Sequence, residues 1–238
     1  MRGPRAAHPP APACRVTKVM TYTLRAGLSF CPVENRLLFL DLTADRYFCL
    51  SPAAEAAFGR LHRGEAFDAP DRECLANLAC TGLLIESDRT AAITACAAPT
   101  IATSLIANAQ QSSPASGQMV ALVHLSLARV ELRVAGLARA LARFSRRKRN
   151  ARIAADTDRV AGIAAAFEAT KAFVSAHDLC LPRSLGIAHR LLSVGARPQL
   201  VLGVKLGPFL AHAWVQCGDT LVNERTEVAR MFTPILVL

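Results

Sequence analysis

Two residues in the second half of the chain could together carry out acyl transfer through a thiol. Cys180 lies two residues before Pro182, which favours a helix start, so Cys180 is expected at a helix N-terminus. The free amides and the positive dipole end there favour thiolate over thiol, and the same amides could hold an oxyanion. His212 lies within an apolar run that is predicted to be a strand. A cysteine at a helix start and a histidine on a following strand match thiol-dependent acyl transfer.

A third residue that orients the histidine is expected shortly after His212, and the candidates are Asp219, Asn223 and Glu224. Asp219 lies in a turn about 20 Å along the strand from His212 and is out of reach. A two-residue turn would pair Trp214 with Asn223, whereas a three-residue turn or a bulge would bring Glu224 to the His212 side. A carboxylate stabilises an imidazolium better than an amide does. This preference favours Glu224 and a bulged hairpin, while the residues alone leave Asn223 as the alternative.

The first half of the chain is predicted to form a small sheet followed by helices. Turn residues bound three short strands, at 24–30, 36–41 and 46–50. Ser51-Pro52 is typical of a helix start, and a second helix is expected from Asp71. This order resembles a winged helix, so a DNA-binding regulator is one hypothesis. Residues 20–90 hold ten acidic and seven basic residues, which argues against DNA binding, because DNA affinity comes from neutralising phosphates with basic residues. A module that binds a peptide at the sheet edge fits this charge better.

Composition suggests the domain boundaries. Residues 1–19 are expected to be a disordered extension, 20–90 the first domain, 91–117 a linker rich in Ala, Ser and Thr, and 118–238 the second domain. The second domain is predicted to hold three helices and then three strands. The helices are expected at 120–144, at 158–176 and from Pro182, and the strands at 200–206, 209–217 and 220–224.

Charge and cysteine usage exclude several classes of protein. The net charge is +10, and the excess lies in the second half, with a dense basic run over 143–152. That run fits a solvated helix end or a contact for an acidic partner. The sequence holds eight cysteines but no CxxC pair, which fits neither a zinc site nor a disulfide framework. No apolar stretch is long enough for a membrane span, so we expect no membrane insertion. Prolines stand near the N-terminus where a signal peptide would need an apolar stretch, so we expect a cytoplasmic location. No metal or cofactor motif is found, and an ATP requirement is left open.

Several separate motifs of the second half resemble the lasso-peptide B proteins, and they occur in the same order. They are Cys180-Leu181-Pro182-Arg183-Ser184-Leu185, Leu200-Val201-Leu202-Gly203-Val204, Phe209, and Ala211-His212-Ala213-Trp214-Val215. Members of this family are leader peptidases with a transglutaminase-like, papain-related Cys-His-Asp core. The resemblance covers residues 118–238 and implies that Cys180 attacks the scissile carbonyl while His212 acts as base and then acid. Glu224 stands where the family has an aspartate.

The first half resembles the PqqD-like precursor-recognition domain that some family members carry in front. The likeness rests on the order of strands and helices, on Asp45-Arg46-Tyr47-Phe48 and on Gly82-Leu83-Leu84. It implies that the precursor leader adds as a strand beside the third strand, near Tyr47 and Cys49. Trp214 is expected beside the catalytic site, as a packing residue or a substrate contact.

Together these patterns predict a two-domain α+β protein. The N-terminal domain would be winged-helix-like and PqqD-like, and the C-terminal domain a transglutaminase/papain-like cysteine protease. Its partners would be the precursor leader and a lasso cyclase resembling asparagine synthetase. DNA is not expected to be a partner. The alternatives are a transglutaminase-like protease or acyltransferase that acts on another peptide, and a non-catalytic scaffold that presents the precursor.

Overall fold

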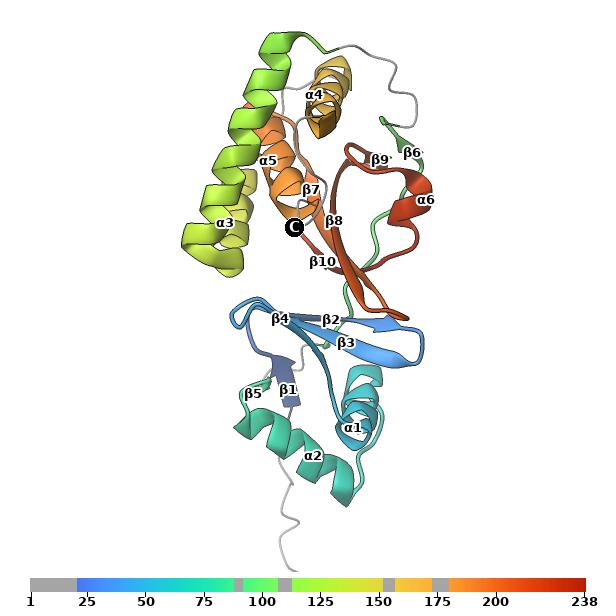
Figure 1. The fold of residues 1–238 in the computed structure, drawn as a ribbon. Coiled ribbons are helices and arrows are strands. Elements are labelled where there is room, and N and C mark those ends of the chain that lie inside the picture. Colours follow the sequence, from blue (N-terminus) through green and yellow to red (C-terminus); the bar gives the residue numbers. More distant parts are fainter. Residues whose placement is uncertain (1–20, 88–91, 107–112, 152–156, 173–179) are drawn as a thin grey trace, which may run out of the picture.

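The structure, a computed structural model, describes residues 21–87, 92–106, 113–151, 157–172 and 180–238 (Figure 1). The elements of the first unit are β1 (Thr21–Leu24), β2 (Leu28–Val33), β3 (Arg36–Asp41), β4 (Arg46–Cys49), α1 (Pro52–Arg63), α2 (Ala69–Cys80) and β5 (Leu84–Ser87). Those of the second are β6 (Thr103–Ser104), α3 (Ala115–Arg149), α4 (Thr157–Ala169), the 3₁₀ turn η1 (Thr170–Ala172), α5 (Cys180–Ser193), β7 (Gln199–Lys205), β8 (Leu210–Cys217), β9 (Thr220–Leu221), α6 (Thr226–Ala229) and β10 (Thr233–Val237).

The first unit contains an antiparallel sheet in the order β2-β3-β4 and a separate pair of strands, β1 and β5. The prediction of one strand over 24–30 is wrong. The chain turns at Gly27, where φ is 85°, and this turn separates β1 from β2. The first helix is confirmed: the Ser51 side chain accepts a hydrogen bond from the Ala54 amide, and Gly64 ends α1 in the left-handed conformation. The second helix starts earlier than expected, because Asp68 and not Asp71 is its N-cap.

The two faces of the β2-β3-β4 sheet serve different units. Phe30 and Phe39 face α1 and pack around Phe58, in a core that belongs to the first unit. Leu38 and Leu40 lie on the opposite face and belong to the core of the second unit. β10 also packs against β2. The two units therefore share buried apolar surface, and a separated first unit would expose one face of its sheet to water.

The second unit is built on a five-stranded sheet in the order β10-β7-β8-β9-β6. α5 packs against both β8 and α3, so α5 lies between the sheet and α3 (Figure 1). α3 is longer than predicted and is interrupted at Gly136, where φ is 77° and ψ is 168°. The third strand is shorter than predicted, because pairing stops at Leu221.

The segment predicted to be a linker contributes to both units. Ile93 is buried in the core of the first unit, and β6 pairs in parallel with β9 in the sheet of the second. The extension expected at residues 1–19 lies outside the described residues, as does the end of the helix expected over 158–176 beyond residue 172. Within the described residues, no helix combines the length and apolar character needed to cross a membrane.

Candidate active site

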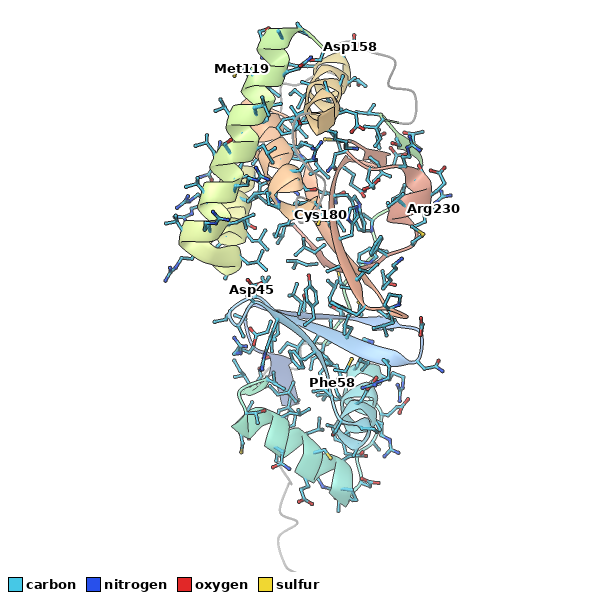
Figure 2. The ribbon with its side chains drawn as sticks, in the orientation of Figure 1. Asp45, Phe58, Met119, Asp158, Cys180 and Arg230 are labelled. Carbon is cyan, nitrogen blue, oxygen red and sulfur yellow. The ribbon has the colours of Figure 1, made fainter. Side chains whose placement is uncertain are left out.

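The structure brings Cys180 and His212 together. α5 begins at Cys180, as the sequence predicts, and β8 carries His212 opposite Gly203 of β7. The thiol of Cys180 and the ring of His212 form a hydrogen bond, and the amides of Leu181 and Ala213 also donate to the sulfur. Figure 2 shows Cys180 at the end of α5 that lies against the sheet. The helix start therefore holds the sulfur beside a base and among amide donors.

The electrostatics favour an ion pair of thiolate and imidazolium. Burial alone would raise the pKa of Cys180, but the hydrogen bond and charge of His212 and the two amides lower it below its usual value. Burial alone would lower the pKa of His212, but hydrogen bonds to Cys180 and Glu224 raise it to about 9. By contrast, burial raises the pKa of Cys31 to about 12 and that of Cys217 to about 11. The surroundings of Cys180 thus favour its thiolate, whereas Cys31 and Cys217 are held as thiols.

Glu224 completes the group, although the expected bulged hairpin is wrong. Glu224 Oε2 lies 2.6 Å from His212 Nε2, which leaves the other ring nitrogen for the thiol. The turn between β8 and β9 has two residues, since Cys217 pairs with Thr220 and Gln216 with Leu221. If pairing continued in that register, Glu224 would lie on the face of the sheet opposite His212. Glu224 reaches the histidine because β9 ends at Leu221 and the chain bends over residues 222–224.

Buried hydrogen bonds hold this bend, and sequence reasoning missed their role. Asn223 Oδ1 accepts a hydrogen bond from the Val215 amide at 2.7 Å, and Asn223 Nδ2 donates to Ser184 Oγ at 3.0 Å. Ser104 Oγ donates to the carbonyl oxygen of Glu224 at 2.7 Å. Asn223 is therefore a brace for the bend and does not occupy the position beside His212. A sequence signal for this role is absent, because the brace depends on an irregular end of pairing.

Two aromatic rings enclose the imidazole of His212. The Phe232 ring lies 5.1 Å away and the Trp214 ring 6.2 Å away, both inclined by about 30°. Trp214 has 0% of its surface exposed, which corrects the expectation of a direct substrate contact. A Cβ on Gly203 would lie 2.5 Å from the Trp214 ring, so only glycine leaves room for the indole there. Trp214 thus acts as packing behind the histidine.

Comparison with known families identifies the type of the second domain. The family model described as the transglutaminase-like superfamily matches residues 121–237. These residues form a transglutaminase-like domain. The match includes Cys180, His212 and Glu224, and it supports a fold of the cysteine protease or acyltransferase type. The comparison with curated proteins and the comparison with solved structures each found no match. The PqqD-like assignment of the first unit stays a prediction.

Strand β4 of the first unit lies close to the candidate active site of the transglutaminase-like domain. Tyr47 lies on the face of the sheet that packs against that domain, and its ring lies 5.3 Å from the ring of Phe209. Burial raises the pKa of Tyr47 to about 12, and the nearby Asp45 and Cys180 add to the shift. Cys49 lies on the same strand and is exposed. Tyr47 is thus a first-unit side chain that lies near Cys180.

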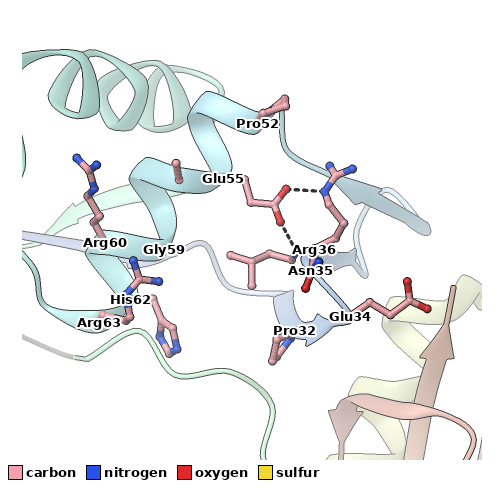
Figure 3. A pocket seen from close by; sticks show the side chains of 12 residues that line it. Pro32, Glu34, Asn35, Arg36, Pro52, Glu55, Gly59, Arg60, His62 and Arg63 are labelled. Atoms are coloured by element: carbon pink, nitrogen blue, oxygen red, sulfur yellow. Dashed lines mark hydrogen bonds and ion pairs between the residues drawn. The ribbon is translucent and has the colours of Figure 1, made fainter.

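A separate cavity of about 620 Å³ lies between the β2–β3 turn and α1, apart from the transglutaminase-like domain (Figure 3). Glu55 crosses it and accepts hydrogen bonds from Arg36 and from the Leu37 amide. The other two arginines of its wall also have carboxylate partners: Arg60 pairs with Asp71 and Arg63 with Glu65. Because each cation is already neutralised, this cavity offers no charge for an anionic ligand.

We expect Asn223→Ala to lower both stability and turnover. The change leaves the Val215 amide buried without its acceptor, which costs about 1–3 kcal/mol in the free energy of unfolding. It also frees the bend that presents Glu224. Urea unfolding measures the first effect, and the turnover number of the folded variant measures the second. Asp219→Ala, in the exposed turn of the same hairpin, is the matched control. The brace would be disproved if Asn223→Ala matched this control in both measurements.

Proposed function

We propose that this chain is a cysteine peptidase that removes the leader from a ribosomally synthesised lasso-peptide precursor. The observation that carries the proposal is the hydrogen-bonded series Cys180, His212 and Glu224 within the transglutaminase-like domain. The resemblance of the motifs around Cys180 and His212 to the lasso-peptide B proteins supports the finer assignment. Cys180 and His212 would be catalytic, and Glu224 would orient the imidazole and stabilise its charge.

The residues suggest a two-step acyl transfer. The Cys180 sulfur attacks the scissile carbonyl carbon, and the C–N bond breaks as His212 gives its proton to the leaving amine. The leader is then held as a thioester on Cys180, and the core peptide leaves with a free N-terminus. His212 next takes a proton from water, whose oxygen attacks the thioester and releases the leader acid. The amides of Leu181 and Ala213, which act on the Cys180 sulfur, would be donors for the developing oxyanion.

The leader would dock along the open edge of β4. Within the described residues β4 pairs with β3 alone, so its other edge can accept a further strand. Tyr47 lies on this strand and contacts Phe209, which comes three residues before His212 in the chain. A peptide bound along β4 would therefore be led toward Cys180. Main-chain hydrogen bonds would supply affinity, and the exposed β4 side chains, with Cys49 among them, would supply selectivity.

The product distinguishes this proposal from acyl transfer to an amine. Transglutaminase-like chemistry would form the same thioester but would pass the acyl group to an amine and not to water. In the peptidase reading, the freed core amine would be cyclised by a partner that resembles asparagine synthetase. Hydrolysis adds one water to the summed mass of the fragments, whereas transfer joins the leader to the amine.

The test uses short peptides encoded beside this chain's gene, with mass spectrometry of the products. We expect one internal cleavage site and two fragments whose summed mass exceeds the precursor by one water. Tyr47→Ala should raise KM by about tenfold for the full precursor, because about 1.4 kcal/mol of docking is lost. It should leave KM unchanged for a short peptide that lacks the leader.

The exposed α2 residue Glu73, changed to alanine, is the control for the Tyr47 variant. Tyr47→Ala kinetics equal to those of Glu73→Ala would contradict docking at β4. Joined products instead of hydrolysed ones would make the chain an acyltransferase.

A further inference from the structure

Lys205 is a cation on the same face of the sheet as His212. It pairs with Leu210 across β7 and β8, and Gly203 pairs with His212 two residues farther along, so the two side chains share a face. The Lys205 ammonium lies over the Phe232 ring, 5.3 Å from its centre. That ring is in turn 5.1 Å from the ring of His212. The ammonium is therefore at most about 10 Å from the imidazole, a distance that about three residues of extended peptide span.

The exposed part of the chain next to His212 is the part that lies beside Lys205. Residues 207–211 are exposed, whereas residues 213–216 are buried. Leu210, the cross-strand partner of Lys205, is 46% exposed. The exposed end of β8 also faces the first unit, because the Phe209 ring contacts the Tyr47 ring there (Figure 1). A peptide that reaches His212 along this end of β8 therefore passes Lys205.

Within the described residues, no carboxylate lies at ion-pair distance from the Lys205 ammonium. Glu224, the acidic residue of the site, is bonded to His212. Lys171, whose charge acts on Glu224, has its own partner in Glu168 at 2.7 Å. The Phe232 ring thus holds the Lys205 ammonium by a cation–π contact and leaves it without a counter-charge from this part of the chain.

We propose that Lys205 is a specificity-determining residue that binds an acidic side chain of the peptide, within about three residues of the scissile bond. The inference rests on the proposed function, because it assigns a substrate class to the same site. A carboxylate of the peptide would accept a charge-assisted hydrogen bond from the ammonium. Lys205 is half-buried, so this ion pair is screened less than one at a fully exposed position.

The test uses the full chain and short peptides that span the cleavage site. Each peptide carries one glutamate, placed in turn at each of the three positions on either side of the scissile bond, and no other charge at these positions. A matched peptide has glutamine in its place. We expect kcat/KM for glutamate to exceed that for glutamine by about tenfold or more at one position, as for a hydrogen bond to a charged group. Added salt should narrow the difference, because it screens the pair.

Variants assign the preference to Lys205. Lys205→Met keeps an unbranched apolar side chain over Phe232 and removes the charge, so it should hydrolyse both peptides at the rate that the unchanged protein shows with glutamine. Lys205→Arg should keep the preference for glutamate, and Lys205→Glu should prefer a peptide with lysine at that position. Lys148→Met, in the last turn of α3, is the matched control and should keep the preference for glutamate.

Four results would overturn the inference. Hydrolysis of every glutamate and glutamine pair at equal rates would exclude recognition of an acid but leave the peptidase proposal standing. A preference for glutamate that Lys205→Met retains would assign the recognition to another residue. Loss of hydrolysis of both peptides in Lys205→Met would give the lysine a structural role. No hydrolysis of any peptide by the unchanged protein would contradict the proposed function itself, and the inference with it.

Discussion

Replacing Cys180 with alanine is expected to abolish cleavage of the precursor while leaving its binding intact. Removal of the nucleophile from a cooperating catalytic group costs a factor of about 10⁴ or more in kcat. The leader would dock through main-chain hydrogen bonds to β4, none of which involves the Cys180 sulfur, so its dissociation constant should change by less than about twofold. Mass spectrometry of the products measures the first quantity, and fluorescence anisotropy of a labelled leader measures the second.

Cys217→Ala is the matched control for this variant. Cys217 lies on β8, five residues beyond His212, and burial raises the pKa of its thiol to about 11. We expect its activity to equal that of the unchanged protein. Cleavage by Cys180→Ala at an undiminished rate would contradict the mechanism. Loss of activity in both variants would show that these two cysteines are needed for folding.

Replacing His212 with alanine is expected to be nearly as damaging as the loss of the thiol. The change removes the base and also the charge that lowers the pKa of Cys180, so burial would then dominate and raise that pKa. We expect kcat/KM to fall by at least about 10³-fold. Raising the pH should recover part of the loss, because a free thiol ionises as the pH approaches its pKa. Steady-state kinetics across pH provide the measurement.

The pH profile of the unchanged protein belongs to the same prediction. The active form holds a thiolate and an imidazolium, so kcat/KM should fall below the lowered pKa of Cys180 and above the pKa of His212, about 9. Glu224 is one of the groups that raise the pKa of His212. Glu224→Gln should therefore move the alkaline limb to lower pH and leave a smaller loss of rate than His212→Ala. An unmoved alkaline limb would contradict the role given to Glu224.

Local signals in the sequence were sufficient for both ends of α1 and for placing Cys180 in the first turn of a helix. Ser51 and Gly64 mark both ends of α1, and Pro182 marks the helix that begins at Cys180. These features depend on a few neighbouring residues, so a single sequence contains them. The alternation along β8 likewise predicted that His212 and Trp214 share one face, although the burial of Trp214 required the structure.

Features that depend on distant contacts were not predictable. Glu224 was expected beside His212 for the wrong reason, because the position of a bend after β9 depends on Asn223, Ser184 and Ser104. Ser104 lies in a segment whose composition is that of a linker. The sequence predicted two domains joined by a linker, but the second face of the β2-β3-β4 sheet packs on the transglutaminase-like domain. The alternation of side chains along a strand shows which residues share a face, but it does not show which unit covers that face.

Competitive alkylation of the cysteines tests the central claim most directly. The full chain is treated with a limiting amount of iodoacetamide at about pH 7, and the modified residues are mapped by mass spectrometry against time. Cys49 and Cys80 are exposed, whereas Cys180 is only partly exposed, so exposure alone would favour the first two. We predict that Cys180 reacts first and that His212→Ala removes its advantage. Faster labelling of Cys49 and Cys80, with Cys180 reacting only as the pH nears 9, would contradict a thiolate–imidazolium pair.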